Sequence, residues 1–248
     1  MNGAFYIGAT SLQAQQRGLE VIANNVANMN TVGFKRSHAV FAELAGEADP
    51  IGQAGFAPLA GVQVSSASRV FDQGQLRETG QRLDLAISGD GFIEVLGRQG
   101  ELVLWRGGAL RIGAEGQLET TEGLQLKSAV TVPEGARDIV IDRGGQVSAK
   151  LGEETIPLGQ IELVSAPDAE QLRPVGGGYY AIPDQADPAP VDLAESGAAF
   201  VQGSVEGSNV ELTSEMVSLL LMQRAYSASA QVIQAGDQLM SIANNLRR

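Results

Sequence analysis

Few side chains in this sequence could do chemistry, and His38 is the first to consider because imidazole is a frequent general base and metal ligand. It is the single histidine, and the chain has no cysteine to join it in a thiolate site. His38 follows a predicted N-terminal helix, with no pattern of a catalytic triad or metal site around it. We therefore expect an exposed loop histidine.

Paired carboxylates are the next candidates, because two carboxyl groups can act as general acid and base. Asp84 with Asp90, and Glu153 with Glu154, are such pairs. Any acidic protein contains pairs of this kind, and the stretch DLAISGD (84–90) lacks the Asp-x-Asp-x-Asp-Gly spacing of a calcium loop. The carboxylates therefore predict neither a catalytic pair nor a metal site.

Two glycine-rich stretches could bind phosphate groups through their backbone amides. SGDGF (88–92) and VGGGY (175–179) match neither the phosphate-binding loop of nucleotide hydrolases nor the dinucleotide fingerprint. We expect both to be hairpin turns. The sequence thus predicts no catalytic residue, no metal and no cofactor.

Composition limits the partners of the chain. The 248 residues carry a net charge of −12, whereas nucleic-acid binding needs clustered positive charge, so we expect no nucleic-acid partner. No cation precedes Arg17, and polar residues interrupt the first apolar stretch, which argues against a cleavable signal peptide. The longest apolar run, LLLM (219–222), is too short to span a membrane.

Both ends of the chain have the apolar spacing of long helices. The first helix, predicted from about Ala4 to Asn28, repeats apolar residues every seven positions, as in a coiled-coil seam. Its asparagines lower helix propensity, so we expect them to hydrogen-bond to other helices. The C-terminal helix has the same seam, is apolar nearly all round at 216–222, and is predicted to begin with a capping box at Ser208 and Glu211.

Two arrangements of these helices are open: an antiparallel pair packed on the rest of one chain, or packing between copies. The apolar stretch 216–222 favours packing between copies, because a surface helix of a monomer would not be apolar on every side. The candidate assembly interface consists of Phe5, Leu12, Leu19, Ile22, Asn24, Asn25, Val26, Asn28, Met29, Leu212, Met216, Leu219, Leu220, Met222, Tyr226, Ile233 and Met240.

The middle of the chain has the pattern of short strands. Alternating segments such as ELVLWR and GQVSAKL are separated by glycine-containing turns, which predicts an antiparallel β-domain. The expected fold is α+β, with a discontinuous, coiled-coil-like helical domain around a central β-domain. The expected bounds are 1–35 for the first helix, 36–75 for an extended connection, 76–200 for the β-domain and 201–248 for the last helix.

Three stretches carry a resemblance to a known family. IANNVANMNTVGFKR (22–36), LDLAISGDGFIEV (83–95) and the segment from VEGSNVELTSEM to DQLM (205–240) resemble, in order and spacing, the signature blocks of the bacterial flagellar rod and hook proteins. The length is closer to the basal-body rod proteins than to hook proteins. The segment 27–44 resembles the distal rod protein, whereas VEGSNV and the short 36–74 connection resemble the proximal one, so both positions stay open.

The resemblance implies a structural subunit, not an enzyme, in the rod of the flagellar basal body, which crosses the periplasm. It implies a homo-oligomeric helical tube with the terminal helices inside and the β-domain outside. It also implies contacts with other rod proteins, the hook protein and the surrounding ring proteins, and export by the flagellar type III apparatus. The residues alone leave open an alternative, a surface-associated hydrolase or carbohydrate-binding β-domain with helical oligomerisation ends.

Overall fold

The computed structural model describes residues 2–45, 59–97, 99–166, 169, 172–183 and 187–246. The chain forms two compact units, neither of them continuous in sequence. We call residues 1–27, 37–69 and 210–248 the helical unit, and residues 28–36 and 70–209 the β unit. The fold class is therefore α+β, as predicted. None of the described helices is long and apolar enough to cross a membrane.

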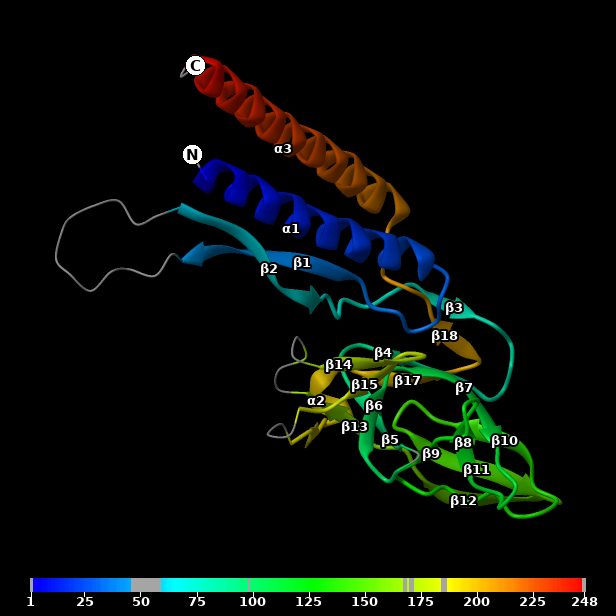
Figure 1. The fold of residues 1–248 in the computed structure, drawn as a ribbon. Helices are drawn as coiled ribbons and strands as arrows, with labels where there is room; N and C mark the ends of the chain where they lie inside the picture. The colour runs from blue at the N-terminus through cyan, green and yellow to red at the C-terminus, as the bar shows by residue number, and fades with distance from the viewer. Residues whose placement is uncertain are drawn as a thin grey trace. The chain divides into compact units, whose positions relative to one another are not determined.

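The helical unit contains α1 (Asn2–Ala27), β1 (Ser37–Ala45), β2 (Leu59–Arg69) and α3 (Leu212–Leu246). In this unit α1 lies between α3 and the β1–β2 pair (Figure 1). The predicted first helix is confirmed to within about two residues at its N-terminal end. The start of α3 differs from the prediction, because the helix begins at Leu212, four residues after Ser208.

Small residues let α1 and α3 approach closely in antiparallel directions. A Cβ added at Gly8 would lie 2.6 Å from Ile233 Cγ1, and one added at Gly18 would lie 2.7 Å from Met222 Cε. Between these points, Gln15 Nε2 donates to Ser229 Oγ at 2.9 Å. The two helices therefore meet through glycine, serine and glutamine as well as through apolar side chains.

Strands β1 and β2 pair antiparallel on another side of α1, in the segment for which we expected an extended connection. The stretch GVQVSSASRV lies in that segment, and its residues up to Arg69 belong to β2 of the helical unit. Alternation identifies a strand without identifying the surface on which it packs, which explains the difference. His38 is exposed, as predicted, but lies in β1 and not in a loop.

The β unit is built from antiparallel strands, as predicted. An eleven-stranded sheet has the central order β14-β15-β6-β5-β9-β8-β7-β4-β17, with β13 and β16 attached, and separate sheets are formed by β10-β11-β12 and β18-β3. The elements of this unit are β3 (Leu76–Glu78), β4 (Asp84–Ser88), β5 (Phe92–Leu96), β6 (Leu102–Trp105), β7 (Gly107–Ile112), β8 (Leu118–Thr120), β9 (Gln125–Leu126), β10 (Arg137–Ile141), β11 (Gln146–Leu151), β12 (Glu154–Gln160), β13 (Leu163–Ser165), β14 (Arg173–Gly176), β15 (Tyr179–Ala181), β16 (Ala189–Pro190), α2 (Leu193–Ser196), β17 (Ala199–Gln202) and β18 (Ser204–Glu206).

The two glycine-rich stretches behave differently. VGGGY joins β14 to β15, which pair with each other, so the predicted hairpin is confirmed. SGDGF joins β4 to β5, which do not pair: β4 lies between β7 and β17, and β5 pairs with β6, β9 and β13. The hairpin prediction for SGDGF is therefore wrong, and this turn instead carries the chain across the sheet.

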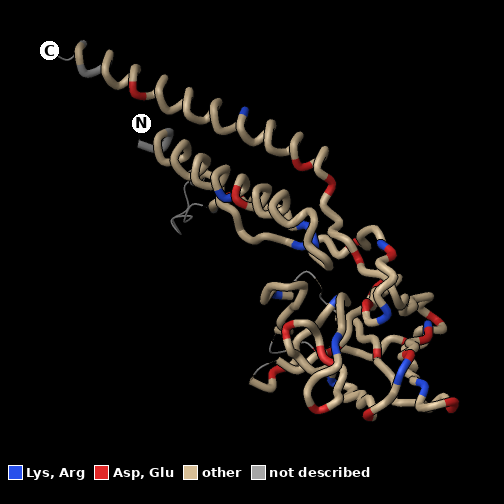
Figure 2. Tube along the Cα trace, turned by 90° about the vertical axis from the view of Figure 1, so that its right-hand side faces the viewer, with Lys and Arg blue, Asp and Glu red and all other residues tan. Residues whose placement is uncertain are grey.

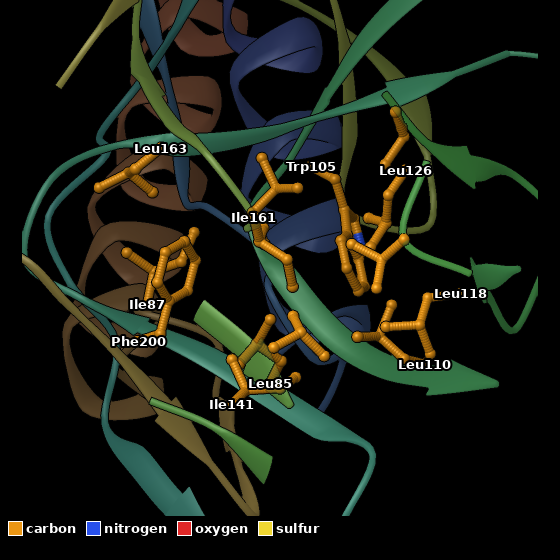
Figure 3. Packing of buried hydrophobic residues seen from close by; sticks show 14 of the residues in the cluster. Leu85, Ile87, Trp105, Leu110, Leu118, Leu126, Ile141, Ile161, Leu163 and Phe200 are labelled. Carbon is orange, nitrogen blue, oxygen red and sulfur yellow. The ribbon is translucent and has the colours of Figure 1, made fainter. Parts of the chain in front are cut away.

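The main core lies inside the β unit and gathers side chains from strands far apart in sequence. Figure 3 shows Leu85, Trp105, Leu118, Ile141 and Phe200 among its members. Phe200 is 2% exposed although it lies at the C-terminal limit of the predicted β-domain. The core therefore depends on the strand that returns towards α3.

Burial changes the titration of one core residue. Tyr179 is 5% exposed and stacks on Trp105, with ring centroids 6.2 Å apart. Burial raises the pKa of Tyr179 above its ordinary value of 10.0; Glu122 acts in the same direction, and a hydrogen bond with Thr120 opposes both. The folded chain thus keeps this proton at a pH where the unfolded chain has lost it.

We expect the free energy of unfolding to fall as the pH rises above 10.0. The unfolded chain loses the Tyr179 proton near that pH, whereas the folded chain still holds it, so each further rise in pH favours the unfolded state. Tyr179→Phe should make this decline shallower. Urea titrations between about pH 8 and pH 11, followed by the fluorescence of Trp105, measure the two slopes. Equal slopes in the two proteins would contradict the raised pKa.

Candidate assembly interface and buried junction

One side of α3 exposes a row of apolar side chains. Between 55% and 63% of the surface of each is exposed, and with 3.6 residues per turn they spread over roughly 160° of the helix surface, outside the sector that contacts α1. Along α3 the described helix has only three charged residues, and Figure 2 shows it mostly uncharged. We call this row the outward face of α3: Met216, Val217, Leu220, Leu221, Val232, Leu239 and Ile242.

The structure divides the predicted interface residues of α3 into two groups. Met216 and Leu220 belong to the outward face, and Leu212 and Tyr226 are exposed beside it. The remaining predicted residues are half-buried; Met222 and Ile233 contact α1, and the others are Leu219 and Met240.

On α1 the predicted residues are mostly used within the helical unit. Ile22 and Asn25 are buried and Asn24 is exposed, whereas Asn28 and Met29 follow the helix and belong to the β unit. The half-buried members are Phe5, Leu12, Leu19 and Val26. The seven-residue spacing therefore selected mainly the side of each helix that packs inside one chain.

Sequence reasoning missed five residues of the outward face: Val217, Leu221, Val232, Leu239 and Ile242. The signal that could have found them is the apolar stretch 216–222, where leucines outside the seven-residue seam must point away from it. The second half of the helix gave no comparable signal, because its exposed apolar residues are separated by glutamine, serine and alanine.

Asn25 explains one of the asparagines of α1. It is 1% exposed; its Nδ2 donates to the Ser37 carbonyl at 2.7 Å, and its Oδ1 accepts from the Ser37 N–H at 3.0 Å. We expected bonds to other helices, but the partner is the first residue of β1. A side-chain amide suits this place because it can donate and accept at once.

A buried ion network, the buried triad, lies inside the β unit. Lys35 Nζ is 2.6 Å from Glu206 Oε1, and Arg106 Nε is 2.9 Å from Glu206 Oε2, with all three side chains at most 2% exposed. Burial lowers the pKa of Lys35 below its ordinary value, and Glu206 opposes this shift, while Arg106 reinforces it. The Glu206 carboxylate thus forms ion pairs with two buried cations.

The triad also forms hydrogen bonds that hold backbone segments. Lys35 also donates to the carbonyls of Phe71 and Asp72, at 3.3 and 2.8 Å. Glu206 Oε1 accepts from the Gly74 N–H at 2.8 Å. These bonds tie the segment before β3 to Glu206 of β18 and to Lys35, which comes from the N-terminal end of the chain.

Arg106 extends the network to the SGDGF turn. Its Nη2 donates to the Gly89 carbonyl at 2.6 Å, and its Nη1 donates to the Gly91 carbonyl. The guanidinium also lies over the ring of Phe92, 5.8 Å from its centroid. The three stretches that carry the family resemblance, 22–36, 83–95 and 205–240, therefore meet at the buried triad.

The carboxylates considered for catalysis do not form a comparable site. Asp84 is buried and accepts a hydrogen bond from Thr79 Oγ1, which gives it a structural role, whereas Asp90 is exposed. Glu153 and Glu154 are exposed, Glu153 in the turn before β12 and Glu154 as the first residue of that strand. Among the described residues, no three histidine, aspartate or glutamate side chains gather where they could hold a metal ion.

Comparisons with known proteins match the ends and the middle of the chain to one family. The family described as "Flagella basal body rod protein" matches residues 5–35, "Flagellar hook protein FlgE/F/G D1 domain" matches 86–149, and "Flagellar basal body rod FlgEFG protein C-terminal" matches 201–246. The first and third matches contain Lys35 and Glu206, and the second contains Arg106.

Relatives match over nearly the full length. The flagellar basal-body rod protein FlgG of Agrobacterium fabrum is 35% identical over 97% of this chain and 98% of its own length. FlgG of Borreliella burgdorferi is 32% identical over the whole of both chains, and the rod protein FlgF of Caulobacter vibrioides is 33% identical over 94% of this chain and 93% of its own. The matches give no support to a hydrolase. The chain belongs to the flagellar basal-body rod protein family and is a structural subunit of the rod in the flagellar basal body.

Proposed function

We propose that copies of this subunit assemble through the outward face of α3 into a hollow helical shaft that passes torque from the motor to the hook. The exposure of this face carries the proposal. Seven large apolar side chains on one side of one helix form a surface that a lone subunit leaves in water at a cost of roughly 25 cal/mol per Å².

The contacts are heterologous, because the outward face of one copy packs on a different surface of the next, and such contacts propagate instead of closing. In this arrangement the terminal helices pack in a coiled-coil-like inner tube and the β unit forms an outer layer. Other rod proteins, the hook protein and ring proteins are its neighbours, and the flagellar type III apparatus exports the chain. The subunit has no catalytic role.

A cysteine footprint tests the proposal, because the chain has no native cysteine. Val217→Cys in the full chain should react readily with a maleimide in the free subunit, where Val217 is 56% exposed. In purified rods the same thiol should react at least about tenfold more slowly, since interface residues lose their solvent contact. Dissolving the rods in denaturant should restore the fast reaction. Equal rates in rods and free subunit would refute the assembly surface.

A further inference from the structure

The backbone passes between the helical unit and the β unit four times, after residues 27, 36, 69 and 209. A single extended strand has two freely rotating dihedral angles at each residue, so it resists twisting poorly unless its peptide groups are held. The hydrogen bonds made by residues next to these passages therefore decide how much load each one can bear.

Asn209 connects the β-unit ends of three of the four passages. Its Oδ1 accepts from the Arg36 N–H at 2.7 Å, and its Nδ2 donates to the Val70 carbonyl at 2.8 Å and to the Asp72 carbonyl at 3.0 Å. The Val70 N–H donates in turn to the Arg36 carbonyl at 2.9 Å. Arg36, Val70 and Asn209 are the β-unit residues next to the passages at 36, 69 and 209. These three residues are thus hydrogen-bonded to one another.

These bonds require a side-chain amide, because one group must accept from a backbone N–H while the other donates to two carbonyls. Aspartate at the same position would offer acceptors to Val70 and Asp72, which need donors. The network is also separate from the core, since Asn209 is half-buried and belongs to neither apolar cluster.

We propose that Asn209 is the positioning residue that binds these three passages together, so that they carry torque jointly. This proposal rests on the proposed function of the subunit as part of a shaft. It adds that stiffness under load depends on a residue that lies outside both the assembly face and the buried triad.

Gln73 supplies a matched control in the same unit. It is also an amide that bridges backbone groups: its Nε2 donates to the Ile87 carbonyl at 3.0 Å, and its Oε1 accepts from the Gly89 N–H at 3.1 Å. Its side chain makes bonds of the same kind without joining any two passages. Gln73→Ala therefore removes similar bonds but leaves the three passages connected.

The experiment compares Asn209→Asp and Gln73→Ala in the full chain. In the free subunit, Asn209→Asp loses the donations to the Val70 and Asp72 carbonyls and places a carboxylate against them, so the segment held by the Val70 N–H should loosen and amide exchange at Val70 should speed up by about tenfold. Exchange at Arg36, whose N–H keeps an acceptor, and in β4 and β5 should stay unchanged. In cells, Asn209→Asp should leave the number of rods normal and lower the rotation speed of tethered cells at high load by at least about twofold. Gln73→Ala should change neither quantity.

Normal rotation of Asn209→Asp cells at high load would overturn the proposal, and so would an equal loss with Gln73→Ala. Absence of rods in Asn209→Asp cells would also overturn it, because the outward face of α3 is untouched. If the assembly proposal is wrong, the result is different: the thiol of Val217→Cys reacts with the maleimide as fast in purified rods as in the free subunit.

Discussion

Replacing Leu221 by aspartate is expected to abolish rod assembly and motility while leaving the subunit folded. Leu221 is 61% exposed on the outward face of α3, so a carboxylate there stays solvated in the free subunit. In an assembled rod the same group would lie in an apolar interface without a partner, at a cost of about 2 kcal/mol or more per contact. Every subunit repeats the contact, so we expect loss of rods and not a graded defect.

Leu221→Met is the matched control, because it keeps the volume and apolar character of the side chain and should support normal swimming. Thermal melting of the purified variants separates an assembly defect from a folding defect, and both variants should have the melting temperature of the wild type. Cells that carry Leu221→Asp and still build rods would remove the outward face from the assembly mechanism.

Replacing Glu206 by glutamine should destabilise the β unit more than any other single change of charge in it. The variant leaves Lys35 and Arg106 buried without a counter-charge, and removing one partner of a buried ion network costs about 3–5 kcal/mol. Lys35→Met should cost less, because the remaining pair of Arg106 and Glu206 is neutral. Urea unfolding followed by Trp105, the single tryptophan, reports the stability of this unit.

The control for Glu206→Gln is Glu94→Gln. Glu94 is itself buried but pairs at 2.8 Å with Lys127, whose side chain is 50% exposed, so the cation left by the substitution stays in water and the loss of stability should be smaller than for Glu206→Gln. If Glu206→Gln and Glu94→Gln reduce stability equally, the buried triad has no special part in holding the β unit.

The sequence predicted the positions of the helices and strands better than it predicted which of their surfaces pack together. Heptad spacing located α1, and alternation located most strands, because both patterns follow from the repeat of one backbone conformation. The same spacing could not show that Met222 and Ile233 contact α1 while Leu221 is left in water. That choice depends on where small residues such as Gly8 and Gly18 allow the two helices to meet.

The buried triad was hidden from sequence reasoning for a different reason. Lys35, Arg106 and Glu206 lie in three separate segments, and a lone charged residue in an alternating strand predicts a solvent-exposed side chain. Only the family resemblance marked these segments as related, because it extends to RGGALRIGAEGQLETTEGLQL, which begins at Arg106. The three charged residues had no signal of their own.

Lys35 and Glu206 are 171 residues apart in the chain, so the bond between them closes a loop that includes almost the whole β unit. Contacts of such separation form later and more slowly than local hairpins, because the entropy of a long loop must be lost first. A chain still lacking the segment from Ser204 onwards has neither β18 nor the carboxylate that neutralises the two cations. The β unit can therefore reach its final state only after the segment that carries Glu206 is present, an order of folding that suits the proposed export through the type III apparatus.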